Sequence, residues 1–210
     1  MTLRAMALLS ALVLGGCSGV FESDLAAPQA YVLRLPPATA AGSPATAGSV
    51  LVQRPEAGPG LDSERIALLR SEHRFDFYAA SRWAAPAPML VEGLMIDALR
   101  ASGTFSVVLD DSAPFSPHYN LRCALRRFEA DYTKGGAAPT IFVSLDCTLG
   151  RHRDRGLIAS FTAQGSAVAA EDRLNSVVGA FESATASAMT ELTRAATEAV
   201  ARDPGVSEGR

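Results

Sequence analysis

The side chains that most often carry catalysis are few in this 210-residue chain, and they stand far apart. The three histidines are His73, His118 and His152, and no two of them fall within the three to five positions that paired zinc ligands prefer. The chain also lacks a Gly-x-Ser-x-Gly nucleophile elbow, a phosphate-binding loop and a His-Glu-x-x-His motif. These observations predict no catalytic residues, no metal site and no cofactor, and hence a protein that is not an enzyme.

The remaining charged clusters favour solvated surface over chemistry. Asp110–Asp111 is an acidic pair, as is Asp62 with Glu64, and such pairs usually lie on solvated loops. A basic cluster surrounds His152 and consists of Arg151, Arg153 and Arg155. It could meet a lipid headgroup or an acidic partner, or it could be a plain exposed turn at a strand end.

Cys17 is the residue with the most specific chemistry. Arg4 precedes an apolar run of about ten residues that is too short to span a bilayer. The tetrapeptide Leu14-Gly15-Gly16-Cys17 then resembles a bacterial lipobox. The resemblance implies a signal peptide over residues 1–16 and lipidation of Cys17, with membrane attachment through N-terminal acyl chains. A buried first helix with a stray cysteine is the structural alternative.

Composition and charge define the rest of the chain. The formal net charge is −3, which argues against a nucleic-acid binder because such a protein usually carries a basic patch. Beyond the signal, no stretch of 18 or more apolar residues predicts a transmembrane helix. We therefore expect a lipidated cysteine and tether over residues 17–28, a single domain over residues 29–202 and a flexible tail over residues 203–210.

Hydrophobic periodicity predicts strands and two helices. Alternation predicts strands at residues 30–35, 50–53, 65–69, 74–78, 105–109 and 157–168. A spacing of three to four predicts one helix from about residue 89 to 102 and an alanine-rich helix from about 175 to 201. Residues 36–49, rich in Pro, Ala, Gly and Ser, indicate a loop.

The segment from Tyr119 to Arg153 predicts a long antiparallel hairpin. If paired positions sum to 270, Cys123 lies opposite Cys147 between two apolar pairs. The apolar phase changes at Arg126-Arg127, which indicates a β-bulge there. Directly opposed cysteines fall within disulfide range and would oxidise beyond the inner membrane. Two buried thiols are the alternative.

Aromatic residues gather just before the first helix. Phe75 and Phe77 share one face of the expected strand and are interpreted as core, whereas Tyr78 points the other way. Trp83 lies in the crossing to the helix, where it could cap the core or meet a partner. Because aromatic and arginine side chains are enriched at binding hot spots, the candidate partner-binding residues are Tyr78, Arg82 and Trp83.

This region resembles the ABC-type transport auxiliary lipoproteins. The matching motifs, in order along the chain, are Pro59-Gly60-Leu61-Asp62, Arg65-Ile66-Ala67, Phe77-Tyr78, Arg82-Trp83-Ala84 and Ser102-Gly103-Thr104-Phe105. The resemblance covers about residues 29–202, and His73-Arg74 departs from it where a tyrosine-rich or glycine-containing turn is more usual.

The resemblance implies a fold, a partner and a location. The fold is α/β of the α+β type, a sheet of about six to eight mostly antiparallel strands with two helices on one face. The protein would face the periplasm from the outer membrane of a Gram-negative bacterium. There it would dock or bridge the MCE-domain periplasmic protein of an ABC transporter that moves phospholipid or other hydrophobic molecules. Binding of phospholipid by the domain itself stays open.

Two other functions are compatible with the residues. One is a periplasmic lipid-binding carrier lipoprotein, which needs a pocket between the sheet and the helices. The other is an envelope-assembly lipoprotein unrelated to transport. The alanine-rich last helix favours tight packing over a pocket.

Overall fold

The computed structural model describes residues 27–35 and 47–203. The predicted signal peptide, Cys17, most of the tether and all of the tail beyond residue 203 lie outside the described residues. The strands are β1 (Gln29–Tyr31), β2 (Ala47–Val52), β3 (Glu56–Ala57), β4 (Arg65–Ser71), β5 (Arg74–Trp83), β6 (Phe105–Leu109), β7 (Tyr119–Asp131), β8 (Thr140–Arg151) and β9 (Leu157–Val168). The helices are α2 (Ala87–Ser102) and α3 (Leu174–Ala201).

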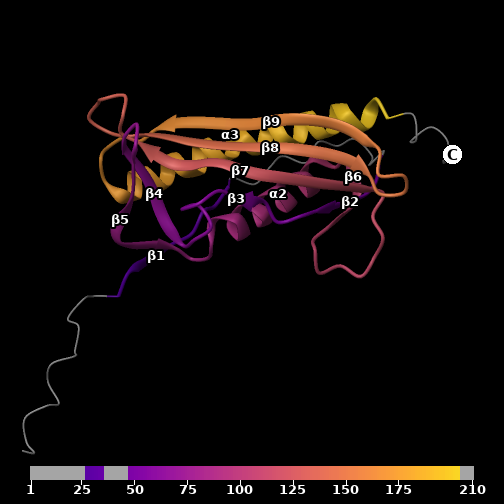
Figure 1. Ribbon diagram of the computed structural model, residues 1–210, viewed down its shortest axis with the longest axis horizontal. Coiled ribbons are helices and arrows are strands. Elements are labelled where there is room, and N and C mark those ends of the chain that lie inside the picture. The colour runs from indigo at the N-terminus through magenta and orange to yellow at the C-terminus, as the bar shows by residue number, and fades with distance from the viewer. Residues whose placement is uncertain (1–26, 36–46, 204–210) are drawn as a thin grey trace, which may run out of the picture.

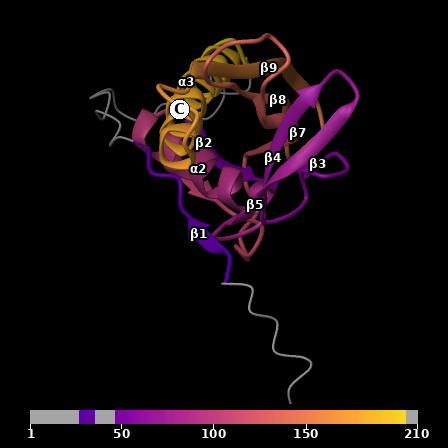
Figure 2. The same cartoon turned by 90° about the vertical axis from the view of Figure 1, so that its left-hand side faces the viewer.

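One nine-stranded sheet carries two helices on the same face, which confirms the expected fold class (Figures 1 and 2). The long ladders β7–β8 and β8–β9 are antiparallel, as is β4–β5. The second edge of β7 pairs in parallel with β2 near its start, β3 in its middle and β4 near its end. Strand β7 therefore runs through the whole sheet and joins its two halves.

The β7–β8 hairpin has the register that the sequence predicts. Cys123 lies opposite Cys147, Phe128 lies opposite Val143, and the register shifts once, between Leu125 and Arg127. The two cysteines form a disulfide, and their Cα atoms are 4.1 Å apart. Since both cysteines are buried, the bond crosslinks the two strands within the core.

The two helices begin and end where local chemistry dictates. Pro86 precedes α2 and Pro88 lies in its first turn, where the missing N–H of proline is tolerated. Gly103 ends α2 in the left-handed region with a φ of 66°. The buried stripe of α3 includes Ala184 and Ala188, whose small side chains let the helix approach the sheet closely. No helix in the described part of the chain is apolar and long enough to cross a bilayer.

Three local predictions are wrong or incomplete. The first strand ends at Tyr31 instead of residue 35, because β5, its parallel partner, ends at Trp83. Beyond it, the Arg34 N–H donates to Glu182 of α3 (2.8 Å). Residues 47–49 belong to β2 and not to a loop. Phe75 is 41% exposed and is not core; its ring lies against the turn at Gly60 and the edge of the Phe77 ring.

Candidate partner-binding surface

A wide bulge in β5 shapes the segment that contains the predicted partner residues. Arg82 lies opposite Arg65, and Phe77 lies opposite Ala67. An advance of five residues along β5 therefore corresponds to an advance of two residues along β4. The extra residues bring Ala80 to a φ of 50°, in the left-handed region that residues with a Cβ rarely adopt. Because of the bulge, the side chains of residues 78–82 do not alternate between the two faces of the sheet as in a regular strand. The sequence pattern did not indicate this bulge.

Arg82 is held at the surface by an ion pair. Its Nη1 lies 2.6 Å from Oε2 of Glu64, and both side chains are about two-fifths exposed. Arg65, the like charge opposite it in the ladder, lies over the Phe77 ring at 3.5 Å from the centroid. The paired charge and the cation–π contact keep the two arginines apart and leave Arg82 accessible to a partner.

Trp83 is a core residue and not a surface residue. Its side chain is 0% exposed, and its ring packs against Phe128 and Phe181, with centroid distances of 5.7 and 5.1 Å. Its Nε1 has no hydrogen-bond partner among the described residues. Of the two alternatives for Trp83, the structure supports the core, because a partner cannot reach the buried ring in this conformation.

Tyr78 is half-buried at the start of a chain of hydroxyl contacts. Its hydroxyl lies 2.8 Å from that of Tyr132, which in turn donates to Oδ1 of Asp172 (2.5 Å). Burial and the contact with Tyr132 raise the pKa of Tyr78. Burial and the acceptor Asp172 also raise the pKa of Tyr132. Tyr78 therefore ties β5 to the loop before α3, and only part of its ring remains for a partner.

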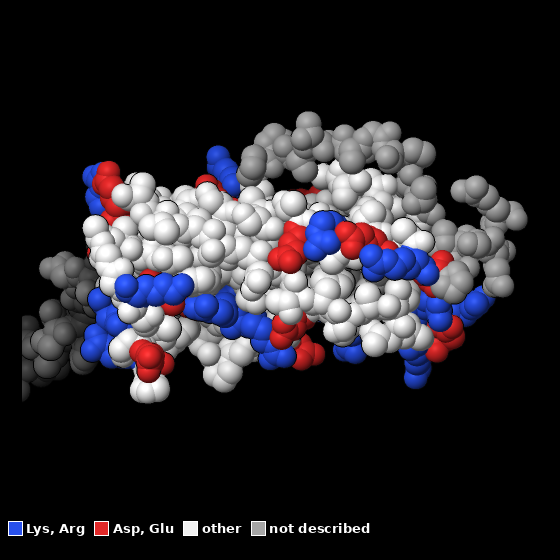
Figure 3. Space-filling view, turned by 90° about the horizontal axis from the view of Figure 1, so that it is seen from above, with Lys and Arg blue, Asp and Glu red and all other residues white. Residues whose placement is uncertain are grey.

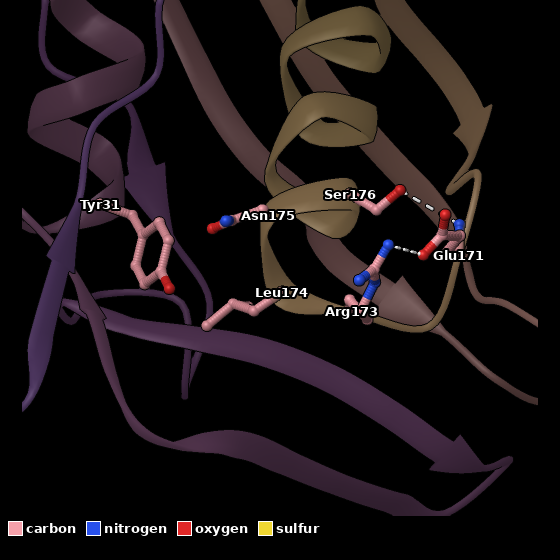
Figure 4. A pocket seen from close by; sticks show the side chains of 6 residues that line it. All are labelled: Tyr31, Glu171, Arg173, Leu174, Asn175 and Ser176. Atoms are coloured by element: carbon pink, nitrogen blue, oxygen red, sulfur yellow. Dashed lines mark hydrogen bonds and ion pairs between the residues drawn. The ribbon is translucent and has the colours of Figure 1, made fainter.

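An open hollow of about 570 Å³ lies beside this region, between β1 and the start of α3 (Figure 4). Tyr31 lines one side, and Leu174 and Asn175 line the other. Ser176 accepts the N–H of Glu171 (3.1 Å), and Glu171 pairs with Arg173. No histidine or cysteine is among its lining residues.

Two histidines that are distant in sequence lie together at the other end of the sheet. The His152 N–H donates to the carbonyl oxygen of His118 (2.8 Å). Nδ1 of His118 lies 2.9 Å from Ser49 Oγ and accepts the Ser49 N–H (3.1 Å). A Cβ on Gly48 would lie 2.5 Å from the His118 ring, so only glycine lets the ring sit there. The contact between His118 and Ser49 holds the loop that precedes β7 against β2.

The described residues contain no group of three or more histidine, cysteine, aspartate or glutamate side chains placed to hold a metal ion. The basic cluster is divided: Arg151 pairs with Asp154 and with Asp203, at 3.1 and 2.5 Å. Arg153 and Arg155 are exposed.

A family model described as the ABC-type transport auxiliary lipoprotein component matches residues 31–195. The chain belongs to this family, and the family resemblance stated from its motifs is confirmed. The family is an auxiliary component of ABC transport systems, which implies a transporter as a partner. A search of curated protein sequences finds no match.

Two solved structures resemble the chain over most of its length. One is a protein from Xanthomonas campestris described as a DUF330 family member. It is 27% identical, covers 86% of this chain and 98% of its own, and has a TM-score of 0.70. The other is described as an uncharacterized protein and is 14% identical, with coverages of 81% and 99% and a TM-score of 0.63. At that identity the second likeness shows the fold alone.

Proposed function

We propose that this protein is a non-enzymatic docking component of an MCE-type intermembrane transport system. It binds the MCE-domain periplasmic protein of the ABC transporter and holds it at the outer membrane. The transported molecule is phospholipid or another hydrophobic compound, and the protein itself hydrolyses nothing. Membership of the auxiliary lipoprotein family supports the transport role.

The observation that carries a docking role over a carrier role is the contact between β9 and α3. A Cβ placed on Gly165 would lie 2.0 Å from the carbonyl oxygen of Ala184 and 2.8 Å from the backbone nitrogen of Ala188. The strand and the helix backbone therefore touch, and no acyl chain fits between them at this point. The hollow at Tyr31 is open and shallow by comparison with an enclosed lipid pocket.

Surface charge also favours a protein partner. On the face seen in Figure 3, acidic and basic side chains lie interleaved, with broad uncharged areas between them. On α3, for example, Arg194 and Arg202 both pair with Glu198. A helix lying on an anionic membrane would instead present a basic polar face. Lipidation of Cys17 is therefore the proposed means of membrane attachment.

Co-purification tests this function. The full-length chain, tagged at its C-terminus, is extracted from membranes, and the MCE-domain protein is quantified in the eluate. We expect recovery from wild type and reduced recovery with Arg82→Glu, whose charge would face the partner. Arg126→Glu is the matched control, because Arg126 is also an exposed arginine in an ion pair, with Asp146 (2.8 Å). Absence of the MCE-domain protein from the wild-type eluate would overturn the proposal.

A further inference from the structure

One end of the molecule presents two adjacent loops with exposed apolar and basic side chains. We call it the distal surface and define it by Phe115, His152, Arg153, Arg155 and Leu157. Phe115 is 69% exposed and Leu157 is 68% exposed, which is unusual for large apolar side chains of a folded domain. His152, Arg153 and Arg155 are exposed as well. Exposed aromatic and arginine side chains together are typical of protein interfaces.

The two loops are held in place by specific contacts. The loop that carries Phe115 is fixed to β2 by the contact between His118 and Ser49. The turn after β8 is joined to that loop by the hydrogen bond from His152 to His118 (2.8 Å). Within the turn, Asp154 accepts the Gly156 N–H (2.9 Å) and pairs with Arg151. The surface is therefore pre-organised, which lowers the entropy cost of binding.

Two exposed cations of the distal surface have no ion pair. Asp154 shares Arg151 with Asp203, and Asp110, on the loop of Phe115, keeps its negative charge while accepting from the backbone and hydroxyl of Ser112. Among the described residues, Arg153 and Arg155 form no salt bridge. Arg155 also has a φ of 58°, in the region that favours glycine. A side chain kept at a backbone cost, at an exposed turn, indicates a function for that side chain.

The distal surface lies opposite the tether. In the β7–β8 ladder, Arg151 lies opposite Tyr119 at the start of β7. Strand β4 lies beside Ala130–Asp131 at the end of β7. The thirteen residues of β7 span about 40 Å at 3.3 Å per residue. The first strand, which follows the tether, lies in the opposite half of the molecule (Figure 1). If Cys17 is in the membrane, the ten positions to Ala27 reach at most about 35 Å, so the half of the molecule that follows the tether is the half held close to that membrane.

We infer that the distal surface, made by the loop of Phe115 and the turn of Arg153 and Arg155, docks an acidic surface of the transporter's periplasmic protein. This inference rests on the proposed function and adds a second contact surface to it, separate from the surface of Arg82. Phe115 and Leu157 supply the apolar contact, and the two arginines supply charge complementarity. A lipid headgroup is disfavoured because this end lies in the half of the molecule opposite the tether (Figure 1).

Photo-crosslinking in living cells tests the inference. A photoreactive amino acid replaces Arg155 or Phe115 in the full-length chain, and Met89, which is 51% exposed on α2, is the control position. We expect the first two positions to crosslink to an Asp/Glu-rich segment of the MCE-domain protein and Met89 to give no such product. Crosslinks only to lipid, to a second copy, to an unrelated protein or to nothing would overturn the inference.

Charge variants separate the inference from the proposed function. The double variant R153E/R155E should weaken binding of the purified MCE-domain protein about tenfold, or about 1.4 kcal/mol, because it reverses both exposed cations of this surface. Arg155→Gly should also weaken binding while leaving the fold intact, because glycine accepts the left-handed backbone. Arg126→Glu reverses the charge of an exposed arginine outside this surface and should bind like wild type. Unchanged affinity of R153E/R155E would sink the inference alone, whereas no binding by wild type would sink both.

Discussion

Substitution of Gly165 by alanine measures how tightly α3 closes on the sheet. The added Cβ would lie 2.0 Å from the Ala184 carbonyl oxygen and 2.8 Å from Ser187 Cβ. A normal carbon–oxygen contact is above 3.0 Å, so α3 must move by about 1 Å, and the obstacle is backbone that cannot rotate away. Overpacking of this kind costs about 1–3 kcal/mol. For a domain of this size that lowers Tm by about 2–12 °C.

Gly179→Ala is the matched control within α3 itself. Nothing lies within 4 Å of a Cβ at Gly179, and alanine is favoured over glycine in a helix interior. We expect that variant to gain about 0.5–1 kcal/mol, so the two identical substitutions should have opposite signs. Urea unfolding followed by circular dichroism gives both free energies of unfolding. If Gly165→Ala is as stable as wild type, the sheet and helix can separate, and the carrier function regains support.

Three further substitutions test other contacts. Replacement of both Cys123 and Cys147 by alanine should cost about 3 kcal/mol of unfolding free energy in the chain-entropy treatment, and urea titration measures it; retention of full stability would contradict a structural disulfide. Trp83→Ala should cost about 3–5 kcal/mol because the ring is fully buried, and near-native stability in the same titration would place Trp83 at the surface instead. Because folding raises the pKa of Tyr132, its protonated hydroxyl contributes stability at pH values below the ordinary pKa of tyrosine. This contribution is lost as the pH rises through the pKa of Tyr132 in the folded state. Tyr132→Phe should therefore flatten the alkaline fall in Tm, and an unchanged profile would exclude this tyrosine as its source.

The sequence predicts those elements whose partners are adjacent along the chain. The hairpin register and its bulge at Arg126-Arg127 follow from the apolar alternation of two neighbouring strands, because a slip by one residue would turn every side chain over. Both helices follow from their spacing and their proline and glycine boundaries. These signals are local, so the sequence alone is enough to read them.

The sequence does not predict contacts between distant short segments. The parallel ladders of β2, β3 and β4 with β7 join only two or three residue pairs each, too few to leave a pattern. The bulge at Ala80 contains no glycine to mark it, and it moved Trp83 from the expected crossing into the last position of β5. The pairing of His118 with His152 depends on the sheet order, although Gly48 before Ser49 was a signal of close packing.

Retention of the MCE-domain protein by the membrane-anchored chain tests the docking function most directly. Wild-type and Cys17→Ser chains are expressed at equal levels, and the MCE-domain protein is quantified in outer-membrane fractions. The account predicts that this protein co-fractionates with the outer membrane in cells with the wild-type chain and is lost from that fraction with Cys17→Ser. Equal amounts of the MCE-domain protein in the outer-membrane fractions of wild-type and Cys17→Ser cells would contradict a docking role. The same amount in the outer-membrane fraction of cells without the gene would also contradict it.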